Sequence, residues 1–280
     1  MTRKPLPLAG VAGWPVAHSL SPLMMNAWLE ASELDGQYAA FAVAPDRFAD
    51  AVRALPALAI TGLNVTVPHK ASALQAASQA SEAARAIGAA NLLLNQENGL
   101  FADNTDIVGI NAAIEGAGGA HASKPAVIVG AGGAARAAMF HVKQAGFSHV
   151  RMINRTIGTA DALARAFGIE ATTYPLDQAE RALEGAGLVI QSSVMGMEGR
   201  PDFAPNMSGL DADALVFDMV YAPLVTPLLG RAREAGLRTA DGLSMLIGQA
   251  RPSFEAFFGA PPREIDMRAI LLEALGEAKP

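Results

Sequence analysis

Short runs of apolar residues alternate along this chain with longer segments whose apolar positions recur at helical spacing. This alternation is typical of layered α/β folds, in which helices cover a central sheet. In the first part of the chain, strands are predicted at residues 8–12, 38–43, 60–67, 90–94 and 100–102. Helices are predicted to begin at Ser21-Pro22 and near Pro45-Asp46, and to span residues 69–80.

The pattern changes near Lys124-Pro125, where the apolar run Ala126–Val129 is followed by glycines and a helix over 134–145. A strand that is apolar at every position is expected to be buried on both faces, as in a parallel sheet. A strand at 150–153 follows, and strands and helices alternate onward to Phe217. From Asp241 to near Leu275 the pattern is helical again.

Composition narrows the class of protein. With 280 residues, 51% hydrophobic and 17% charged, the chain suits two globular domains. A net charge of -6 argues against a nucleic-acid partner, and the absence of cysteine excludes disulfides and thiolate catalysis. No apolar run reaches the roughly 18 residues of a membrane span, and the basic start Met1–Pro5 lacks a signal-peptide core. We therefore expect a cytoplasmic protein without a membrane partner.

A glycine-rich motif follows the strand at 126–129. It consists of Gly130, Ala131, Gly132, Gly133, Ala134 and Ala135. In a strand-turn-helix context these positions permit a tight turn, close approach of the backbone to a pyrophosphate, and packing of the helix on the strand. The motif predicts a Rossmann-type dinucleotide site, although a ligand-free strand-to-helix turn has the same pattern.

The tip of the next strand carries Asn154, Arg155 and Thr156, where an NAD site usually places an acidic residue. A carboxylate would repel a 2′-phosphate, whereas a guanidinium binds it through two parallel hydrogen bonds. The sequence therefore favours NADP over NAD. The alternative is that Arg155 is an ordinary solvated loop residue.

Two serines, Ser19 and Ser21, bracket the start of the first helix. We expect Ser21 to cap this helix, with Pro22 at its first position. Hydroxyl donors beside free helical N–H groups also suit a carboxylate pocket.

Polar residues gather at two further strand ends. Asn64 and Thr66 are two residues apart in a predicted strand, so their side chains point to the same face. Lys70 follows in the first turn of the next helix, where a cation is unfavourable beside the positive end of the helix dipole. That unfavourable position indicates a functional lysine, against the alternative of a solvated surface residue. Asp106 ends the polar run 103–106, which is a second candidate for a functional site. The alternative is that this run forms only a turn and a helix cap. Ligands of open α/β sheets gather at such strand ends.

Taken together and in order, these segments resemble the shikimate dehydrogenase family. The matching motifs are Ser19–Pro22, Asn64–Lys70, Gly88–Asn91, Asp103–Asp106, Gly130–Ala135, Asn154–Thr156, Asp218–Tyr221 with Pro223 and Thr226, and Asp241–Leu243 with Met245, Leu246 and Gln249. The resemblance spans nearly the whole chain.

The resemblance implies roles for several of the matching residues. Lys70 would transfer the proton, with Asp106 as its partner. The substrate would be bound by Ser19, Ser21, Thr66, Asn91, Asp106, Tyr221 and Gln249. NADP would be bound by Gly130, Ala131, Gly132, Gly133, Ala134, Asn154, Arg155 and Thr156, with Met219 and Gly242 near the nicotinamide. No metal is implied, and the five histidines are scattered.

The implied activity is reversible reduction of 3-dehydroshikimate by NADPH, in the biosynthesis of chorismate and the aromatic amino acids. The implied fold has a discontinuous α/β substrate domain, residues 1–106 plus 242–280, and a Rossmann-type NADP-binding domain, residues 107–241, with a mostly parallel sheet. A quinate-preferring or dual-specificity dehydrogenase stays open, as does a non-catalytic sensor of NADP or a metabolite. The oligomeric state stays open between monomer and homodimer.

Four departures from the family pattern bear on specificity. They are Met25 in place of His, Leu92 in place of Thr, Gln191-Ser192-Ser193 in place of Asn-Ala-Thr, and Thr159 in place of an additional Arg. The last leaves Arg155 as the main determinant of NADP binding.

Lys70 and the neighbouring His69 are rival candidates for proton transfer. We expect Lys70→Ala to lower the rate of turnover by roughly 10²- to 10⁴-fold, the range for loss of a general acid or base. His69→Ala should retain near-normal turnover per folded molecule. Steady-state rates of the two variants decide between them, and near-normal turnover by Lys70→Ala would refute the assignment.

Overall fold

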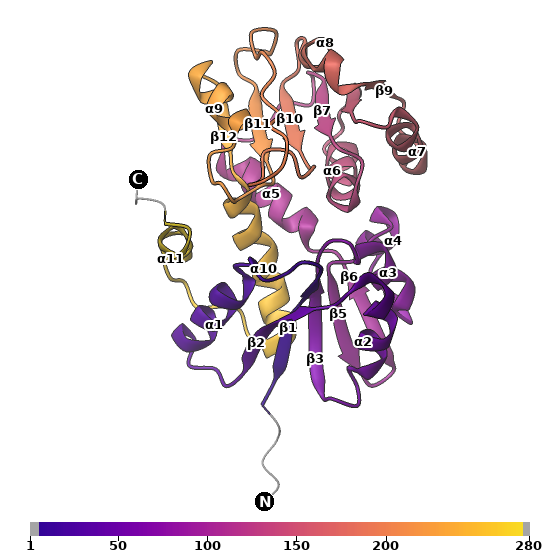
Figure 1. Cartoon of the computed structure of the whole chain (residues 1–280), viewed down its shortest axis with the longest axis vertical. Coiled ribbons are helices and arrows are strands. Elements are labelled where there is room, and N and C mark those ends of the chain that lie inside the picture. Colours follow the sequence, from indigo (N-terminus) through magenta and orange to yellow (C-terminus); the bar gives the residue numbers. More distant parts are fainter. Residues whose placement is uncertain (1–5, 277–280) are drawn as a thin grey trace, which may run out of the picture. The chain divides into compact units, whose positions relative to one another are not determined.

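The computed structural model describes residues 6–276, and it divides the chain into two compact units, each built around one sheet (Figure 1). The first unit comprises Met1–Thr105 and Gln249–Pro280, and the second comprises Asp106–Gly248. The predicted basic start at Met1–Pro5 and the predicted last residue of the substrate domain, Pro280, lie outside the described residues.

The first unit contains a mixed sheet with the strand order β2-β1-β3-β5-β6-β4. β1 pairs in parallel with β2 and β3, whereas β5 runs antiparallel to both β3 and β6. The strands are β1 (Leu8–Gly13), β2 (Gln37–Ala42), β3 (Ile60–Val65), β4 (Gln79–Ala80), β5 (Leu92–Gln96) and β6 (Gly99–Asp103). The antiparallel pair β5–β6 corresponds to the strands predicted at residues 90–94 and 100–102.

Helices of the first unit cover this sheet with apolar side chains. They are α1 (Ser21–Ala31), the short η1 (Pro45–Arg47), α2 (Phe48–Ala54), α3 (Lys70–Ala76), α4 (Glu82–Ile87), α11 (Met267–Ala274) and the second half of α10 (Gly242–Phe258). One core cluster joins Leu63 and Leu93 of the sheet to Phe48 and Val52 of α2. A second contact is made by α10, whose buried Phe254 packs edge-on against Trp28 of α1.

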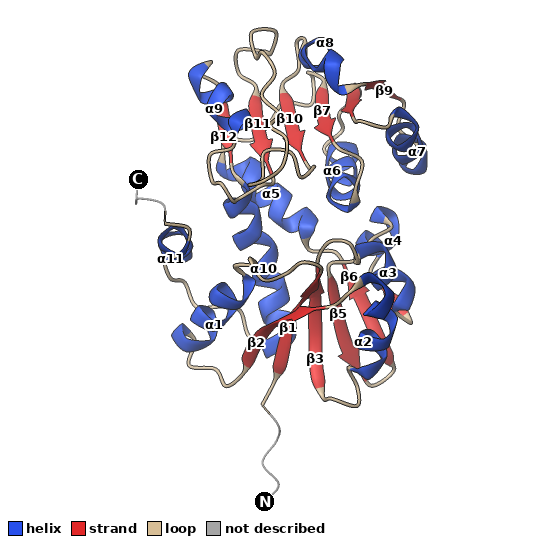
Figure 2. Cartoon of the chain, in the orientation of Figure 1, coloured by secondary structure: helices blue, strands red, loops and turns tan. Residues whose placement is uncertain are grey.

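The second unit contains a wholly parallel sheet in the order β12-β11-β10-β7-β8-β9. Counted from β7, this is the order 3-2-1-4-5-6 of a doubly wound dinucleotide-binding domain. In Figure 2 the arrows of β7, β10 and β11 point the same way. The predicted Rossmann-type domain with a mostly parallel sheet is confirmed.

The elements of this unit follow the alternating pattern of the sequence. Its strands are β7 (Ala126–Val129), β8 (Val150–Ile153), β9 (Ala171–Tyr174), β10 (Leu188–Gln191), β11 (Leu215–Asp218) and β12 (Arg238–Ala240). Its helices are α5 (Asp106–Gly116), α6 (Gly133–Gln144), α7 (Ile157–Phe167), η2 (Leu176–Gln178), α8 (Ala179–Leu183), α9 (Pro227–Glu234) and the start of α10.

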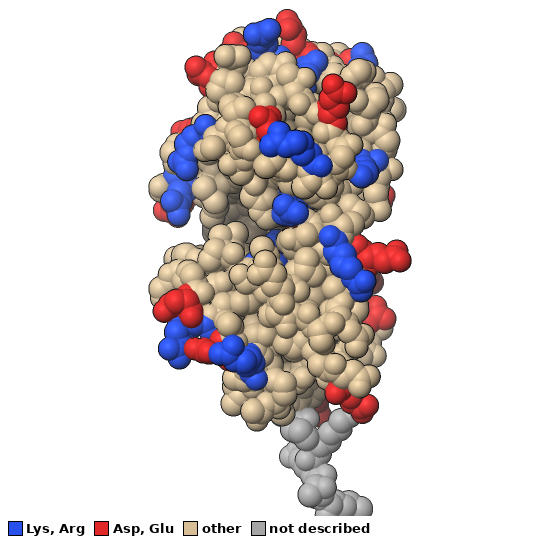
Figure 3. All heavy atoms as spheres, turned by 90° about the vertical axis from the view of Figure 1, so that its right-hand side faces the viewer, with Lys and Arg blue, Asp and Glu red and all other residues tan. Residues whose placement is uncertain are grey.

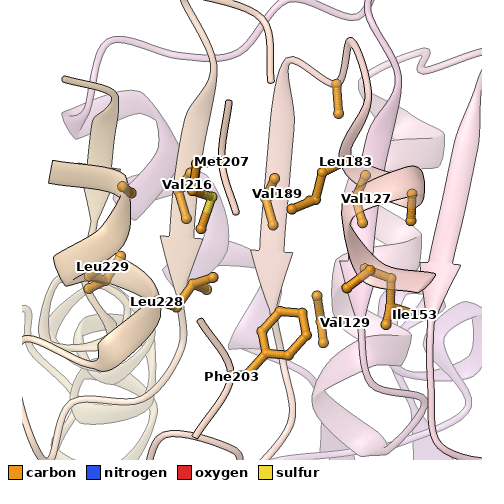
Figure 4. Packing of buried hydrophobic residues seen from close by; sticks show 14 residues of the cluster. Val127, Val129, Ile153, Leu183, Val189, Phe203, Met207, Val216, Leu228 and Leu229 are labelled. Carbon is orange, nitrogen blue, oxygen red and sulfur yellow. The ribbon is translucent and has the colours of Figure 1, made fainter. Parts of the chain in front are cut away.

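Burial on both faces explains the uninterrupted apolar runs of the central strands. Every residue of β7, β10 and β11 is buried. Figure 4 shows Val127, Val189 and Val216 side by side on these neighbouring strands, near Leu183 and Phe203 of the same core cluster. Apolar side chains therefore pack on both faces of the sheet. Polar groups that bind a ligand are expected at the ends of its strands.

The predicted helix over 69–80 is too long at its C-terminal end. α3 stops at Ala76, and residues 79–80 form the strand β4 beside β6. Ser78 and Ser81 donate their backbone N–H groups to the carbonyls of Leu100 and Ala102. These hydrogen bonds to a distant strand replace the helical ones, and no local pattern announces them.

Surface charge is mixed rather than segregated. Basic and acidic side chains are interspersed over the face that Figure 3 shows. Among residues 6–276, no helix combines the length and the apolar character that crossing a bilayer requires.

Candidate active site

Lys70 is the first residue of α3, directly after the turn that follows β3. Thr66 fixes that turn, since its N–H donates to the Ala12 carbonyl of β1 and its own carbonyl accepts the His69 N–H, both at 2.9 Å. The Lys70 carbonyl accepts the Ala90 N–H at 2.8 Å. Lys70 therefore lies, half-buried, at the carboxyl end of β3 and next to the segment that precedes β5.

Asn91 connects three segments of the first unit through its side-chain amide. Its Oδ1 accepts the Thr105 N–H at 2.7 Å, and its Nδ2 donates to Thr105 Oγ1 at 3.0 Å and to Gln249 Oε1 at 2.9 Å. The amide is only 3% exposed. The structure thus brings together two predicted substrate residues, Asn91 and Gln249, that are far apart in the sequence.

Asp106 follows Thr105 and opens α5, with 1% of its surface exposed. The residues before it are held by buried hydrogen bonds, because Asn104 donates to the Ala89 carbonyl at 2.9 Å and Thr105 bonds to Asn91. A short hydrogen-bonded path therefore leads from the Lys70 carbonyl through residues 90–91 to the residue that precedes Asp106.

The prediction that Ser21 caps the first helix is wrong. Ser21 is the first helical residue, and the N-cap position belongs to Leu20, whose backbone is already helical at φ -79° and ψ -7°. Ser19 covers the first free N–H instead, because its Oγ accepts from the Ser21 N–H at 3.3 Å. Among the described residues, the Ser21 hydroxyl has no hydrogen-bond partner, although the residue is 9% exposed. The Ser21 hydroxyl is therefore available as a hydrogen-bond donor.

His69 has structural contacts on both its ring edge and its ring face. Its Nε2 donates to the Val43 carbonyl at 2.7 Å, and its ring stacks on Phe48 with centroids 4.4 Å apart. Only 2% of its surface is exposed. These contacts give His69 a packing role and weaken its claim as the rival proton-transfer group.

Sequence reasoning missed a buried polar network beneath Asn91. Tyr38 donates to Asn64 Oδ1 at 2.7 Å, and Asn64 Nδ2 donates to Ser253 Oγ at 2.9 Å. Ser253 Oγ also lies 3.4 Å from Thr105 Oγ1. Burial raises the pKa of the Tyr38 hydroxyl well above its ordinary value. A usable signal was present, since Ser253 lies four residues after Gln249, on the same helical face.

In the second unit, the glycine-rich turn joins β7 to α6. Gly130 has φ +102°, and a Cβ on it would lie 3.1 Å from Ser192 Oγ and Ser193 Cβ, so only glycine fits. Gly132 is the extended N-cap of α6, and a Cβ there would meet nothing within 4 Å. The turn therefore offers open space at the N-terminus of a helix with no acid in its first turn, which fits a pyrophosphate.

The tip of β8 lies next to this turn in the sheet. Asn154 Nδ2 donates to the Thr156 carbonyl at 2.8 Å, which shapes the turn that leads into α7. Arg155 is exposed, and within residues 6–276 its guanidinium forms no ion pair. A long, solvated cation on a defined turn is suited to bind a phosphate group.

Met219 follows β11 and is packed backbone to backbone against the start of α10. Its N–H donates to the Gln191 carbonyl at 3.0 Å. A Cβ on Gly242 would lie 2.3 Å from the Met219 carbonyl oxygen, so this contact requires glycine. The predicted nicotinamide residues Met219 and Gly242 are thus in direct contact, and the half-buried Tyr221 follows two residues later.

The sequence of this chain is similar to those of known proteins of one family. The family model described as the shikimate dehydrogenase substrate binding domain matches residues 11–93, and the model described as shikimate / quinate 5-dehydrogenase matches residues 113–198. The NADP(+) shikimate dehydrogenase of Rhodospirillum rubrum is 45% identical over 95% of this chain and 96% of the relative. That of Maricaulis maris is 43% identical over 96% of each. The chain belongs to the shikimate dehydrogenase family.

The fold agrees with this membership. The crystal structure of shikimate 5-dehydrogenase from Thermus thermophilus, in complex with NADP(H) and shikimate, matches with a TM-score of 0.81 and 34% identity. The match covers 96% of this chain and 100% of that one. The family predicted from the motifs of the sequence is therefore confirmed, as is the two-sheet α/β fold that it implied for a shikimate dehydrogenase.

Among residues 6–276, no group of three or more His, Asp or Glu side chains is placed to hold a metal ion.

Asp218 of the second unit lies in an environment that shifts its pKa upward. Burial raises the pKa of Asp218 to about 7, against the opposing effect of hydrogen bonds from Val220 and Thr226. A carboxyl with a higher pKa in the folded than in the unfolded chain makes folding less favourable as pH rises. The stability that the protonated Asp218 carboxyl contributes is fully present below pH 3.8 and is lost as pH rises to about 7.

We predict that Asp218→Asn changes the pH dependence of stability. Asparagine does not titrate. The free energy of unfolding of the wild type minus that of the variant should therefore fall as pH rises from 3.8 to about 7. The limiting slope is about 1.4 kcal/mol per pH unit. Urea unfolding at a series of pH values measures it, and a difference that is constant across this range would contradict the prediction.

Proposed function

We propose that this protein is an NADP-dependent dehydrogenase that reversibly reduces the ketone of 3-dehydroshikimate to the alcohol of shikimate. Membership of the family supports the reaction class. The observation that supports the site most directly is the hydrogen-bonded path from the Lys70 carbonyl, through Ala90 and Asn91, to Thr105. This path ties the proposed proton-transfer residue to the segment that ends at its proposed partner, Asp106.

Substrate recognition is assigned to hydroxyl and amide groups. Ser19 and Ser21 bind the carboxylate, a role for which the partnerless hydroxyl of Ser21 is available. The remaining polar contacts to the substrate come from Thr66, Asn91, Asp106, Tyr221 and Gln249. Asn91 and Gln249 are already oriented by their mutual hydrogen bond, so binding costs little side-chain entropy there.

Cofactor binding is assigned to the ends of neighbouring strands in the second unit. The backbone of Gly130–Ala134 and the N-terminus of α6 receive the pyrophosphate, and Asn154–Thr156 receive the 2′-phosphate. Met219 and Gly242 border the nicotinamide. NADPH, when bound, supplies the hydride for the carbonyl carbon.

Proton transfer is assigned to Lys70. As the carbonyl is reduced, negative charge develops on its oxygen, and the Lys70 ammonium donates a proton to that oxygen. In the reverse direction, neutral Lys70 accepts the alcohol proton. Asp106 orients the ammonium and favours its charged form.

The proposed reaction is tested by mixing the protein with shikimate or quinate and with NADP or NAD. Reduced nicotinamide is followed by its near-ultraviolet absorbance, and Lys70→Ala prepared in parallel controls for contaminating dehydrogenases. We expect the highest kcat/KM with shikimate and NADP. Faster turnover with quinate or NAD would support the dual-specificity alternative, and saturable binding without turnover would support a sensor.

Arg155 should determine the preference for NADP. Arg155→Ala removes a charged hydrogen-bond donor worth about 1.5 to 3 kcal/mol, so KM for NADP should rise roughly 10- to 100-fold. KM for NAD, which has no 2′-phosphate, should change little. Arg165→Ala, an exposed arginine on the same loop-helix segment, is the matched control. Equal losses with both cofactors would show that Arg155 does not bind the 2′-phosphate.

A further inference from the structure

Asp218 is a fully buried acid at the end of β11 whose two carboxylate oxygens both accept hydrogen bonds. Oδ1 accepts the Val220 N–H at 2.9 Å, and Oδ2 accepts the Thr226 hydroxyl at 2.7 Å. Val220 and Thr226 lie near opposite ends of the segment 219–226, which we call the β11–α9 loop. One carboxylate therefore closes this loop from both ends.

Thr226 gives the second of these bonds a fixed direction. It is the N-cap of α9, and its Oγ1 accepts the Leu229 N–H at 3.3 Å. Because the oxygen accepts from the helix, its single proton is directed toward Asp218. The positive end of the α9 dipole also favours an anion there.

The β11–α9 loop carries two residues of the proposed site, Met219 and Tyr221. Its first residue is held by the Gln191 carbonyl and by contact with Gly242. Its far part is less covered, since Pro223 is exposed and Val225 is 41% exposed. Apolar packing thus holds the loop weakly beyond its first residues, and the carboxylate supplies a fixed link across it.

We propose that Asp218, acting through Thr226, is a positioning residue that holds the β11–α9 loop so that Met219 and Tyr221 present the correct surface to cofactor and substrate. This inference rests on the proposed function, which assigns those two residues to the site. Asp218 itself is buried and touches neither ligand.

Two substitutions break the link and one preserves it. Asp218→Asn has one side-chain oxygen in place of two, so it can accept from the Val220 N–H or from the Thr226 hydroxyl but not from both as the carboxylate does. Thr226→Val removes only the hydroxyl at nearly constant volume. Thr226→Ser keeps the hydroxyl and is the matched control.

Kinetics provide the first measurement. In Asp218→Asn and Thr226→Val we expect kcat to fall about tenfold or more, because small misplacements in a reacting geometry are costly. The primary isotope effect with shikimate deuterated at its reacting carbon should rise, since hydride transfer becomes slower relative to product release. The dissociation constant for NADPH should change little, because the proposed phosphate contacts lie at Gly130–Ala134 and Asn154–Thr156. Thr226→Ser should resemble wild type.

Hydrogen exchange provides a measurement that does not depend on turnover. In the wild type, the Val220 amide should exchange at least about 100-fold more slowly than the amides of Leu224 and Val225. In folded Asp218→Asn or Thr226→Val the peptide covering 219–226 should exchange faster, while strand β9 at the far edge of the sheet stays unchanged.

The outcomes separate the two hypotheses. Wild-type protein that does not oxidise shikimate would refute the proposed function, and hydrogen exchange would still decide whether the carboxylate holds the loop. Folded variants with wild-type kcat and isotope effect would overturn the positioning role and leave Asp218 a purely structural acid. If neither variant folds, an unprotected Val220 amide in the wild type overturns the proposal, and a protected one supports it.

Discussion

The amide of Asn91 is buried, and a buried amide must have partners for both its oxygen and its nitrogen. Those partners are Thr105 and Gln249, which come from the end of the β5–β6 hairpin and from α10. The requirement therefore joins parts of the chain that are far apart in sequence. It also orients the residues on either side, since Ala90 bonds to Lys70 and Thr105 precedes Asp106. Losing this amide would leave several buried groups unpaired at once, which is costly.

Close packing has a similar effect at the strand ends of the second unit. The central strands are buried on both faces, so their polar chemistry is confined to the carboxyl ends. Glycine is required at two positions there: at Gly130 because its φ is +102°, and at Gly242 because the Met219 backbone lies so close. Gly132, in contrast, faces open space, where a phosphate group can approach the backbone.

Motifs carried by consecutive residues were predictable. The strand-glycine-helix sequence at 126–144 predicts its own conformation, because each residue's role depends on its chain neighbours. One prediction was wrong because a distant strand decided the local structure, and another because a local backbone angle did. Residues 79–80 look helical but pair with β6, and Ser21 looks like a cap but lies one residue inside the helix. In both cases the deciding quantity is a backbone hydrogen bond or dihedral angle that side-chain identity leaves open.

By itself, the sequence determined the α/β class, the Rossmann-type unit with its glycine turn, and the family, because these depend on periodicity and on motifs of adjacent residues. Only the tertiary structure decided that Gln249 pairs with Asn91, that Ser253 joins the network beneath them, and that Thr226 directs its proton to Asp218. Such contacts need two groups to meet at hydrogen-bond distance inside a dry interior. That meeting is set by how sheets and helices pack, and spacing along the chain does not encode it.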